Sequence, residues 1–272
     1  MKTSKTIKLL SYSTVFIMLV LYLVPLLLVV NTAFKTNPEF IISPNSIAEN
    51  FNFQNFLDAW QQGSFSTYVW NTLLYTGVST VIVIIFSIFA AFPIARGYVK
   101  WSGLLYIFFT MSMFLPNPLV PQFRLMVETG LYNTQLGYIL IRSTGFGVVF
   151  ILFVGYIKSI SKELDEAASI DGCGYGRYMF SVIMPLMKPI IATGIVLTAI
   201  GTWNDLLGPI LYLSDSKLWS ISAGLLNFQG QYGNNWPLLS CGILIVAAPL
   251  LILYIFLQKY IIEGTMSGAV KS

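Results

Sequence analysis

The chain has little charge and no histidine. Of its 272 residues, 15 are Lys or Arg and 11 are Asp or Glu, so only 10% are charged, against about a quarter in an average soluble domain. Without histidine, imidazole acid–base catalysis, histidine-ligated haem and H-E-x-x-H zinc sites are excluded. The two cysteines, Cys173 and Cys241, are too few for a zinc cluster or a disulfide framework. We therefore predict no catalytic residue and no metal site.

Apolar residues take the place of charge: 56% of the chain is hydrophobic and its mean hydropathy is +0.75. These values predict an integral membrane protein. Segments of about 17–24 apolar residues can cross a hydrocarbon core of about 30 Å as helices, and their continuous apolar runs argue against barrel strands. We predict six membrane-spanning helices, over residues 9–30, 72–95, 102–121, 137–157, 189–206 and 238–257.

Six crossings place both termini on one side, and the basic residues indicate which side. With the termini inside, the inner segments hold Lys2, Lys5, Lys8, Arg96, Lys100, Lys158, Lys162, Arg177, Lys188, Lys259 and Lys271. The outer segments and helix ends hold Lys35, Arg124, Arg142 and Lys217. This excess fits the positive-inside rule, so the fold class is an all-α membrane protein with cytoplasmic termini, a single domain over 1–272. Arg142 lies within the fourth segment and is expected to snorkel to the headgroups.

The inner loop over residues 158–188 is longer than a simple connection and has the signals of two short helices. Ser161 is expected to cap the first helix, and Gly172 is expected to end it in the left-handed conformation. Acidic residues suit the positive end of such a helix, and its first turns contain Glu163, Asp165 and Glu166. A second short helix is predicted to run into Pro185.

Small residues give the first helix of this loop a surface that can approach a partner closely. Leu164, Ala167 and Ala168 are spaced i, i+3, i+4 and are expected to share one face. Nothing about a lipid environment calls for such a face on an inner loop. We therefore expect it to contact another protein.

The same loop resembles the EAA signature of permease subunits in binding-protein-dependent ABC importers, written E-A-A-x3-G-x9-I-x-L-P. The matching positions are Glu166, Ala167, Ala168, Gly172 and Pro185, with Val182 and Met184 as conservative departures. Other segments are similar to the carbohydrate-importer permeases of the MalG type: Asn31 to Lys35, Asn71 and Thr72, Pro116, Pro121, Gly130 to Thr134, Trp203 to Asp205, and Gly268 to Lys271.

This resemblance implies a type I ABC importer in the bacterial cytoplasmic membrane. The implied partners are two ATP-binding subunits, a second permease and an extracytoplasmic solute-binding protein, and the implied solute is a sugar or oligosaccharide. The resemblance assigns ATPase coupling to Leu164, Glu166, Ala167, Ala168, Asp171, Gly172 and Pro185. No G-x-x-x-x-G-K-[ST] phosphate loop occurs in the chain, so ATP and magnesium are expected in the partner ATPase and this chain is expected to be neither an enzyme nor a cofactor protein.

Polar residues near the outer end of the fifth segment are candidates for the solute path. Trp203, Asn204 and Asp205 combine an aromatic face, an amide and a carboxylate, the groups that commonly hold sugars, and an ionisable residue at membrane depth indicates function. The alternatives are that the triplet shapes the helix end or contacts the binding protein. An amphipathic stretch in the first outer loop, residues 51–60, predicts either a helix on the membrane surface or a docking surface for the binding protein.

Two other classes of membrane protein are weaker interpretations. A gradient-driven secondary transporter of a small polar solute predicts repeated halves and buried charges, whereas the sequence has no internal repeat and few acids in its apolar segments. A membrane-embedded enzyme needs a catalytic set, and neither histidine nor G-x-S-x-G is present.

Overall fold

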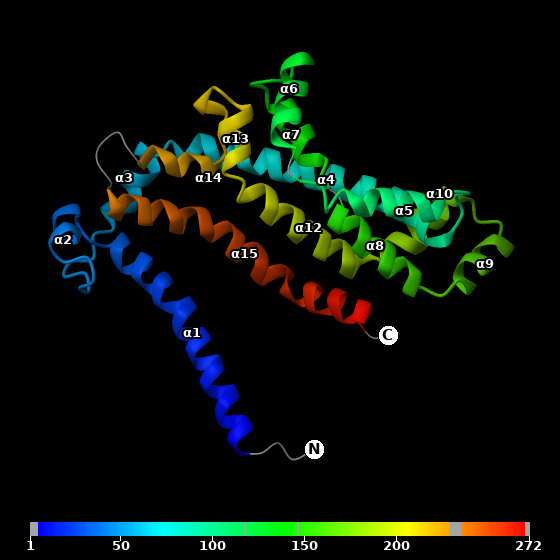
Figure 1. Ribbon diagram of the computed structural model, residues 1–272, viewed down its shortest axis with the longest axis horizontal. Helices are drawn as coiled ribbons and strands as arrows, with labels where there is room; N and C mark the ends of the chain where they lie inside the picture. Colours follow the sequence, from blue (N-terminus) through cyan, green and yellow to red (C-terminus); the bar gives the residue numbers. More distant parts are fainter. Residues whose placement is uncertain (1–4, 117, 146, 229–234, 270–272) are drawn as a thin grey trace. The chain divides into compact units, whose positions relative to one another are not determined.

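The computed structural model describes residues 5–116, 118–145, 147–228 and 235–269. Within these ranges every regular element is helical and none is a strand (Figure 1), so the predicted all-α class is confirmed. The long helices are α1 (Lys5–Ala33), α4 (Phe65–Arg96) and α15 (Trp236–Ala269). The others are α2 (Asn37–Ile42), α3 (Gln54–Gln62), α5 (Ser102–Met111), α6 (Leu119–Glu128), α7 (Gln135–Ser143), α8 (Gly147–Ser159), α9 (Glu163–Ile170), α10 (Tyr175–Tyr178), the π-helical turn η1 (Met179–Ile183), α11 (Met184–Leu186), α12 (Lys188–Trp203), α13 (Leu207–Tyr212), η2 (Ser216–Leu218), α14 (Ile221–Gly224) and η3 (Leu225–Phe228).

Three of these helices are long and apolar enough to cross a membrane: Ile7–Ala33, Phe65–Arg96 and Trp236–Phe256. Two bent pairs, α7 with α8 at 42° and the segment Tyr175–Leu186 with α12 at 77°, could each add one crossing. Length and composition therefore allow up to five crossings in the described part of the chain. Six crossings and cytoplasmic termini stay predictions, and Lys2 and Lys271 lie outside the described residues.

The third predicted crossing, 102–121, is not one continuous helix. Helix α5 ends at Met111, and α6 begins only at Leu119. Pro116 and Pro118 explain the interruption, because each lacks an amide donor and disfavours helical geometry in the residue before it. An average of hydropathy over the segment does not detect such a break.

The fourth predicted crossing, 137–157, is divided into α7 and α8. The hydroxyls of Ser143 and Thr144 donate to carbonyls of the preceding turn, at 2.7 Å each, and such bonds compete with helix continuation. Gly147 opens α8 against the interruption after α5, since a Cβ there would lie 2.8 Å from Ser112 Oγ. The start of α8 thus packs on the residues that directly follow α5.

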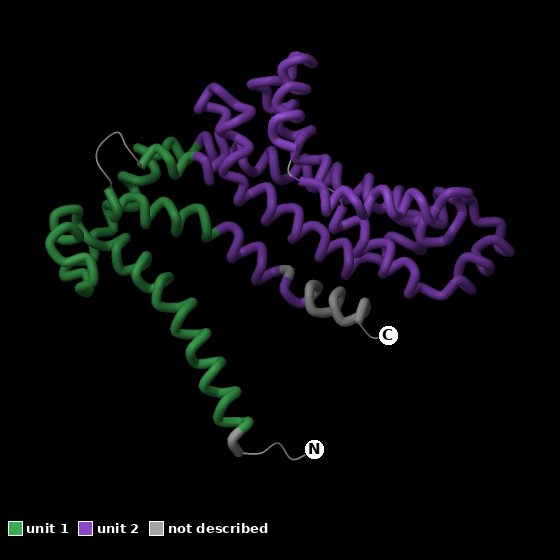
Figure 2. Tube along the Cα trace, in the orientation of Figure 1, with its two compact units in different colours: residues 1–66, 224–248 green, residues 67–223, 249–272 purple. Residues whose placement is uncertain are grey.

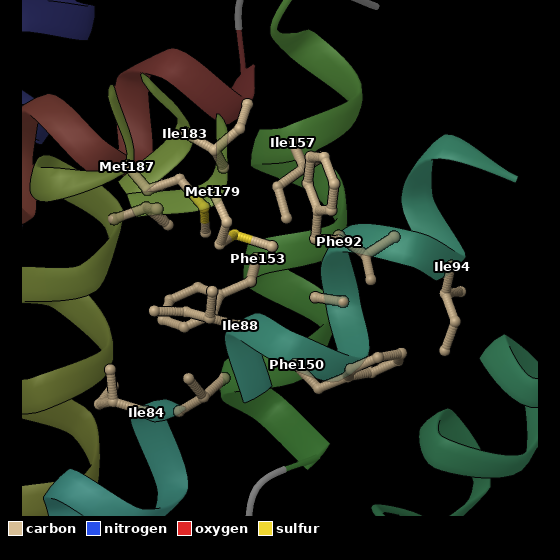
Figure 3. Close-up of a cluster of buried hydrophobic side chains, with 14 of the residues drawn as sticks. Ile84, Ile88, Phe92, Ile94, Phe150, Phe153, Ile157, Met179, Ile183 and Met187 are labelled. Atoms are coloured by element: carbon tan, nitrogen blue, oxygen red, sulfur yellow. The ribbon is translucent and has the colours of Figure 1, made fainter. Parts of the chain in front are cut away.

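The chain forms two compact units, coloured in Figure 2. Unit 2 contains residues 67–223 and 249–272, and within it α8 packs on both α5 and α12. Its main core joins the later turns of α4 to α8 and to the helical segment before α12. Figure 3 shows this core, with Ile84, Ile88, Phe92, Ile94, Phe150, Phe153, Ile157, Met179, Ile183 and Met187 labelled. The inner loop is therefore anchored by apolar packing on its second half, through η1 and Met187.

A second buried cluster of unit 2 surrounds the earlier turns of α4. Tyr75 packs edge-on against Tyr138 of α7, with ring centroids 4.8 Å apart, and Tyr212 of α13 is buried in the same cluster. The Tyr75 hydroxyl donates to the carbonyl of Leu218 at 2.7 Å. One continuous helix, α4, thus contributes to both of these clusters.

Unit 1, residues 1–66 and 224–248, contains a fully buried lysine. The Lys35 ammonium donates to the carbonyls of Ser43 and Pro44, at 2.7 and 3.1 Å, and to Ser46 Oγ at 3.1 Å. All three donors of the ammonium are satisfied, which is what makes a buried lysine tolerable. Composition alone identified Lys35 only as an outer basic residue.

Helix α3 in unit 1 carries the predicted amphipathic stretch. Phe53, Leu57 and Trp60 are 68%, 57% and 39% exposed. Both interpretations of this helix, a membrane-surface element and a docking surface, remain predictions.

Candidate functional site

Helix α9 in the inner loop is fixed at both ends by local hydrogen bonds. At its start, Ser161 Oγ accepts from the amide of Glu163 at 3.3 Å, while Lys162 holds the cap position one residue later than predicted. At its end, Gly172 has φ +65°, as expected. The amides of Cys173 and Gly172 donate to the carbonyls of Ala168 (2.9 Å) and Ser169 (3.1 Å), which is the bonding pattern of a Schellman motif.

The side of α9 that faces away from the core of unit 2 is exposed, and it combines apolar with acidic side chains. Leu164 is 40% exposed and Ile170 is 86% exposed, and Glu166, Ala167 and Asp171 are exposed beside them. Ala168 is half-buried against the core of unit 2. The predicted face of Leu164, Ala167 and Ala168 is therefore divided, with Ala168 turned inward. Pro185, in α11, is exposed.

An ion pair between the buried Arg96 and Asp165 ties α9 to the end of α4, and we call this pair with its two tyrosine partners the Asp165 cluster. It consists of Arg96, Tyr98, Asp165 and Tyr178. Arg96 Nε lies 2.9 Å from Asp165 Oδ2, with the two side chains 1% and 12% exposed. The Tyr98 hydroxyl donates to Oδ2 of the same carboxylate at 2.9 Å, and the Tyr178 hydroxyl donates to Oδ1.

Arg96 also binds the backbone that leads into α9. Its guanidinium donates to the carbonyl of Ile160 at 2.9 Å and to that of Ser161 at 3.4 Å. Arginine is suited to this position because its planar fork can serve several acceptors at once. The last residue of α4 thus holds both the entrance to α9 and its first turn.

The electrostatics of the cluster keep its tyrosines protonated. Burial raises the pKa of Tyr178 well above 10, and the hydrogen bond to the Asp165 carboxylate raises it further. Burial and the same carboxylate also raise the pKa of Tyr98. Both hydroxyls therefore stay donors, because an ionised phenol beside a carboxylate would be unfavourable.

Aromatic rings pack against one side of the Asp165 cluster, whose Tyr98 is itself 54% exposed. Phe92 of α4 lies 5.8 Å from the ring of Tyr98, 6.0 Å from that of Tyr178 and 5.8 Å from that of Tyr175. Such contacts exclude water and strengthen the polar interactions inside. Tyr175 shares the ring packing with Phe92, and its side chain is 50% exposed.

A second polar group, the Asp205 cluster, follows the end of α12 and consists of Tyr138, Arg142 and Asp205. The Tyr138 hydroxyl donates to Asp205 Oδ2 at 2.8 Å, and Arg142 lies 3.4 Å from the same atom. Arg142 also donates to the carbonyl of Gly201 at 2.8 Å. A carboxylate within the protein is therefore a partner for the charge of Arg142, and snorkelling of this side chain to the headgroups stays a prediction.

The Asp205 cluster borders a cavity of about 440 Å³ in unit 2, lined also by Gln122 and Asn204. The structure brings Asn204 and Asp205 to this cavity but not Trp203, whose side chain is 4% exposed. A sugar ring therefore has no access to the indole of Trp203 in this conformation. The polar side chains of the lining include two amides, a carboxylate and a guanidinium, which can exchange hydrogen bonds with hydroxyl groups.

Sequence reasoning missed the basic and phenolic partners of both carboxylates. Tyr98 and Asp165 are 67 residues apart in the chain, as are Tyr138 and Asp205, so no local spacing rule connects them. The positions of the two arginines were the signal that could have indicated a need for charge partners: Arg96 ends a long apolar segment, and Arg142 lies within one.

Apolar helices long enough to cross a bilayer, together with an acidic helix in a loop between them, define an integral membrane protein. The chain belongs to the family described as binding-protein-dependent transport system inner membrane component, whose profile matches residues 83–265. This membership confirms the resemblance stated from the EAA signature.

Individual relatives are sugar or probable ABC transporter permeases. The chain is 35% identical to the probable ABC transporter permease protein YurM of Bacillus subtilis, over 95% of this chain and 88% of the relative. It is 33% identical to the melibiose/raffinose/stachyose import permease protein MelC of the same species, over 92% of each. The multiple sugar-binding transport system permease protein MsmG of Streptococcus mutans is 32% identical, over 93% of each.

The fold also matches a solved structure. One chain of a bacterial ABC transporter involved in the import of the acidic polysaccharide alginate superposes with a TM-score of 0.84, covering 95% of this chain and 99% of that one. The two sequences are 21% identical. This likeness establishes the type I importer permease fold.

Proposed function

We propose that the chain is the transmembrane permease subunit of an ATP-driven importer for a sugar or oligosaccharide. The observation that carries the proposal is α9, a short helix with an exposed acidic and apolar surface and a fixed attachment to α4. Membership in the family and the sugar-import names of relatives such as MelC and MsmG support it. The chain would form the translocation path with a second permease and alternate between inward and outward access.

ATP hydrolysis would take place in two partner subunits that hold ATP and magnesium. We assign contact with these subunits to the exposed surface of α9, which has Glu166 and Ala167 near its centre, and we expect Gly172 to set the direction of the chain after it. An extracytoplasmic solute-binding protein would deliver the solute. The excess of basic residues in the inner segments supports a cytoplasmic position for α9 and both termini, in a bacterial cytoplasmic membrane.

The exposed charge of α9 gives a direct test of the proposed function. In proteoliposomes that contain the complete complex, we expect Glu166→Lys to insert normally and to reduce ATP-dependent uptake at least tenfold, because it reverses the charge facing the ATPase. Glu128→Lys, the same change in an exposed acid at the end of α6, is the matched control. Normal uptake in Glu166→Lys, or uptake driven by an ion gradient without ATP, would contradict the proposal, and the second result would favour a secondary transporter.

We further propose that Asn204 and Asp205 line the solute path. Their position at a polar cavity supports this role, while burial of Trp203 argues that the indole shapes the helix end. Uptake and basal ATPase activity of Asn204→Ala and Asp205→Ala should separate a path role from a structural one. We expect uptake to fall for some sugars more than for others; an equal loss for every sugar would assign the residues to gating or to the fold.

A further inference from the structure

The Asp165 cluster joins elements that the chain itself does not join. Through the backbone, α9 is connected to α8 before it and to α10 after it. Through side chains, it is also connected to Arg96, the last residue of α4, and to Tyr98, in the link between α4 and α5. The carboxylate of Asp165 therefore has partners from α4, from the link after it and from α10.

The contacts of the Asp165 carboxylate restrict movement of α9 relative to the end of α4. Two hydroxyl donors and one guanidinium charge converge on one carboxylate that is 12% exposed, and the Arg96 side chain is 1% exposed. A guanidinium buried to this degree depends on its partners, because an unpaired charge there would be strongly unfavourable. The two carbonyls before α9 that Arg96 also binds restrict rotation of α9 about its entrance.

Helix α4 leads from this cluster to the second polar group. It is continuous over 32 residues, a length of about 48 Å at the helical rise. In its earlier turns, Tyr75 packs edge-on against Tyr138, whose hydroxyl donates to Asp205 beside the cavity. Pro93 lies inside α4, one turn before Arg96, but the helix continues through it. A displacement of the Arg96 end would therefore be passed along α4 to the packing around the Asp205 cluster.

We propose that the Asp165 cluster is a positioning device that transmits movement of α9 directly to α4, and so couples the ATPase contact to the cavity. The inference rests on the proposed function and goes further, because it assigns Arg96, Tyr98, Asp165 and Tyr178 to coupling although none of them is part of the exposed face of α9. Asp165, which composition explains as a helix-end charge, acts here inside the subunit. Glu166, its neighbour, keeps the contact with the ATPase.

The alternative is that the cluster only stabilises the folded loop. A stabilising role alone would lower the amount of assembled complex and leave each assembled complex working normally. A coupling role would leave assembled complexes that hydrolyse ATP without importing sugar in proportion. The number of ATP molecules hydrolysed per sugar imported distinguishes the two roles.

The experiment uses the complete complex in proteoliposomes, with its binding protein and ATPase, and compares Asp165→Asn, Arg96→Lys and Tyr178→Phe with the wild type. Tyr175→Phe is the matched control, since Tyr175 packs on Phe92 as Tyr178 does but has no part in the Asp165 cluster. The ATPase that co-purifies with each variant measures assembly. We expect assembly to be retained and the ATP:sugar ratio to rise about tenfold in Asp165→Asn and Arg96→Lys, several-fold in Tyr178→Phe, and not at all in the control, the range expected for loss of site-to-site coupling.

A wild-type ratio in assembled Asp165→Asn or Arg96→Lys would overturn the proposal, as would an equal rise in Tyr175→Phe. If the charged variants fail to assemble, Tyr178→Phe decides: a normal ratio in that variant reduces the cluster to a stabilising role. Failure of the proposed function is distinguishable, because the wild-type complex itself would then show no ATP-dependent uptake.

Discussion

The described part of unit 2 contains two arginine–aspartate pairs that share their components and differ in burial. Each pairs one carboxylate with a guanidinium and at least one tyrosine hydroxyl. In the inner pair the closest approach is 2.9 Å and the Arg96 side chain is 1% exposed. In the other pair the distance is 3.4 Å and the Arg142 side chain is 28% exposed beside a cavity.

The difference indicates two uses of the same chemistry. In a buried pair such as Arg96–Asp165, both carboxylate oxygens have partners within the protein. Such a pair holds two helices in a fixed relative position, and it costs free energy because both charges are removed from water. A pair that borders a cavity can exchange its hydrogen bonds with those of a solute. When its carboxylate and guanidinium separate, hydroxyl groups or water can take the place of the lost partner. The Arg96–Asp165 pair thus fits transmission of movement, and the Arg142–Asp205 pair fits contact with the solute.

The largest expected contrast between the pairs is in stability. Arg96→Ala should lower the free energy of unfolding by about 3–5 kcal/mol, because it leaves a poorly solvated carboxylate without its cation. Arg142→Ala should lower it by about 1 kcal/mol, since that pair is wider and partly hydrated. Denaturation of the purified protein in detergent micelles measures both. Equal losses would mean that burial does not separate the two pairs.

A smaller effect is expected from the backbone that supports the inner pair. Gly172 has φ +65° with open space around its Cβ position, so Gly172→Ala should cost about 1 kcal/mol through backbone strain alone. Gly176, inside α10, has equally open space and no positive φ, so Gly176→Ala is the matched control and should be neutral or slightly stabilising. The same denaturation assay applies. A similar loss in both variants would show that the left-handed end of α9 is not what matters at Gly172.

The smallest effect concerns pH. The pKa values of Tyr98 and Tyr178 are raised from their ordinary 10.0, so their contribution to stability is complete below about pH 10 and is lost only as pH rises through the raised values. The difference in unfolding free energy between wild type and Tyr178→Phe should therefore be constant from about pH 6 to about pH 9. A difference that shrinks within this range would place the Tyr178 hydroxyl in a weaker environment than its contacts indicate.

Local features of the sequence were the most predictable. The helix of the inner loop and the left-handed Gly172 follow from signals within a few residues of each other, and both are present in α9. The long helices α1, α4 and α15 follow from uninterrupted apolar runs. Even here the cap of α9 shifted by one residue, because Lys162 rather than Ser161 occupies that position.

Interactions between distant segments were not predictable. Arg96 and Arg142 could be located only by their distance from the ends of apolar runs, and nothing in one sequence reveals which carboxylate each one meets. The interruptions after α5 and α7 were also missed, since prolines and small polar residues change the backbone without lowering the average hydropathy much. The loop over residues 158–188 could thus be recognised from the sequence, whereas its attachment to Arg96 could not.

Cys173, which follows Gly172 in the Schellman motif of α9, is a native site for a spectroscopic label. It is one of two cysteines in the chain, and it is half-buried directly after α9, whereas Cys241 is fully buried in unit 1. Cys241 donates to the carbonyl of Ala33 at 3.3 Å, a bond that a serine hydroxyl can also make. A Cys241→Ser chain would therefore carry a single native thiol beside α9. A spectroscopic label there could report movement of α9 during transport without a new residue being introduced.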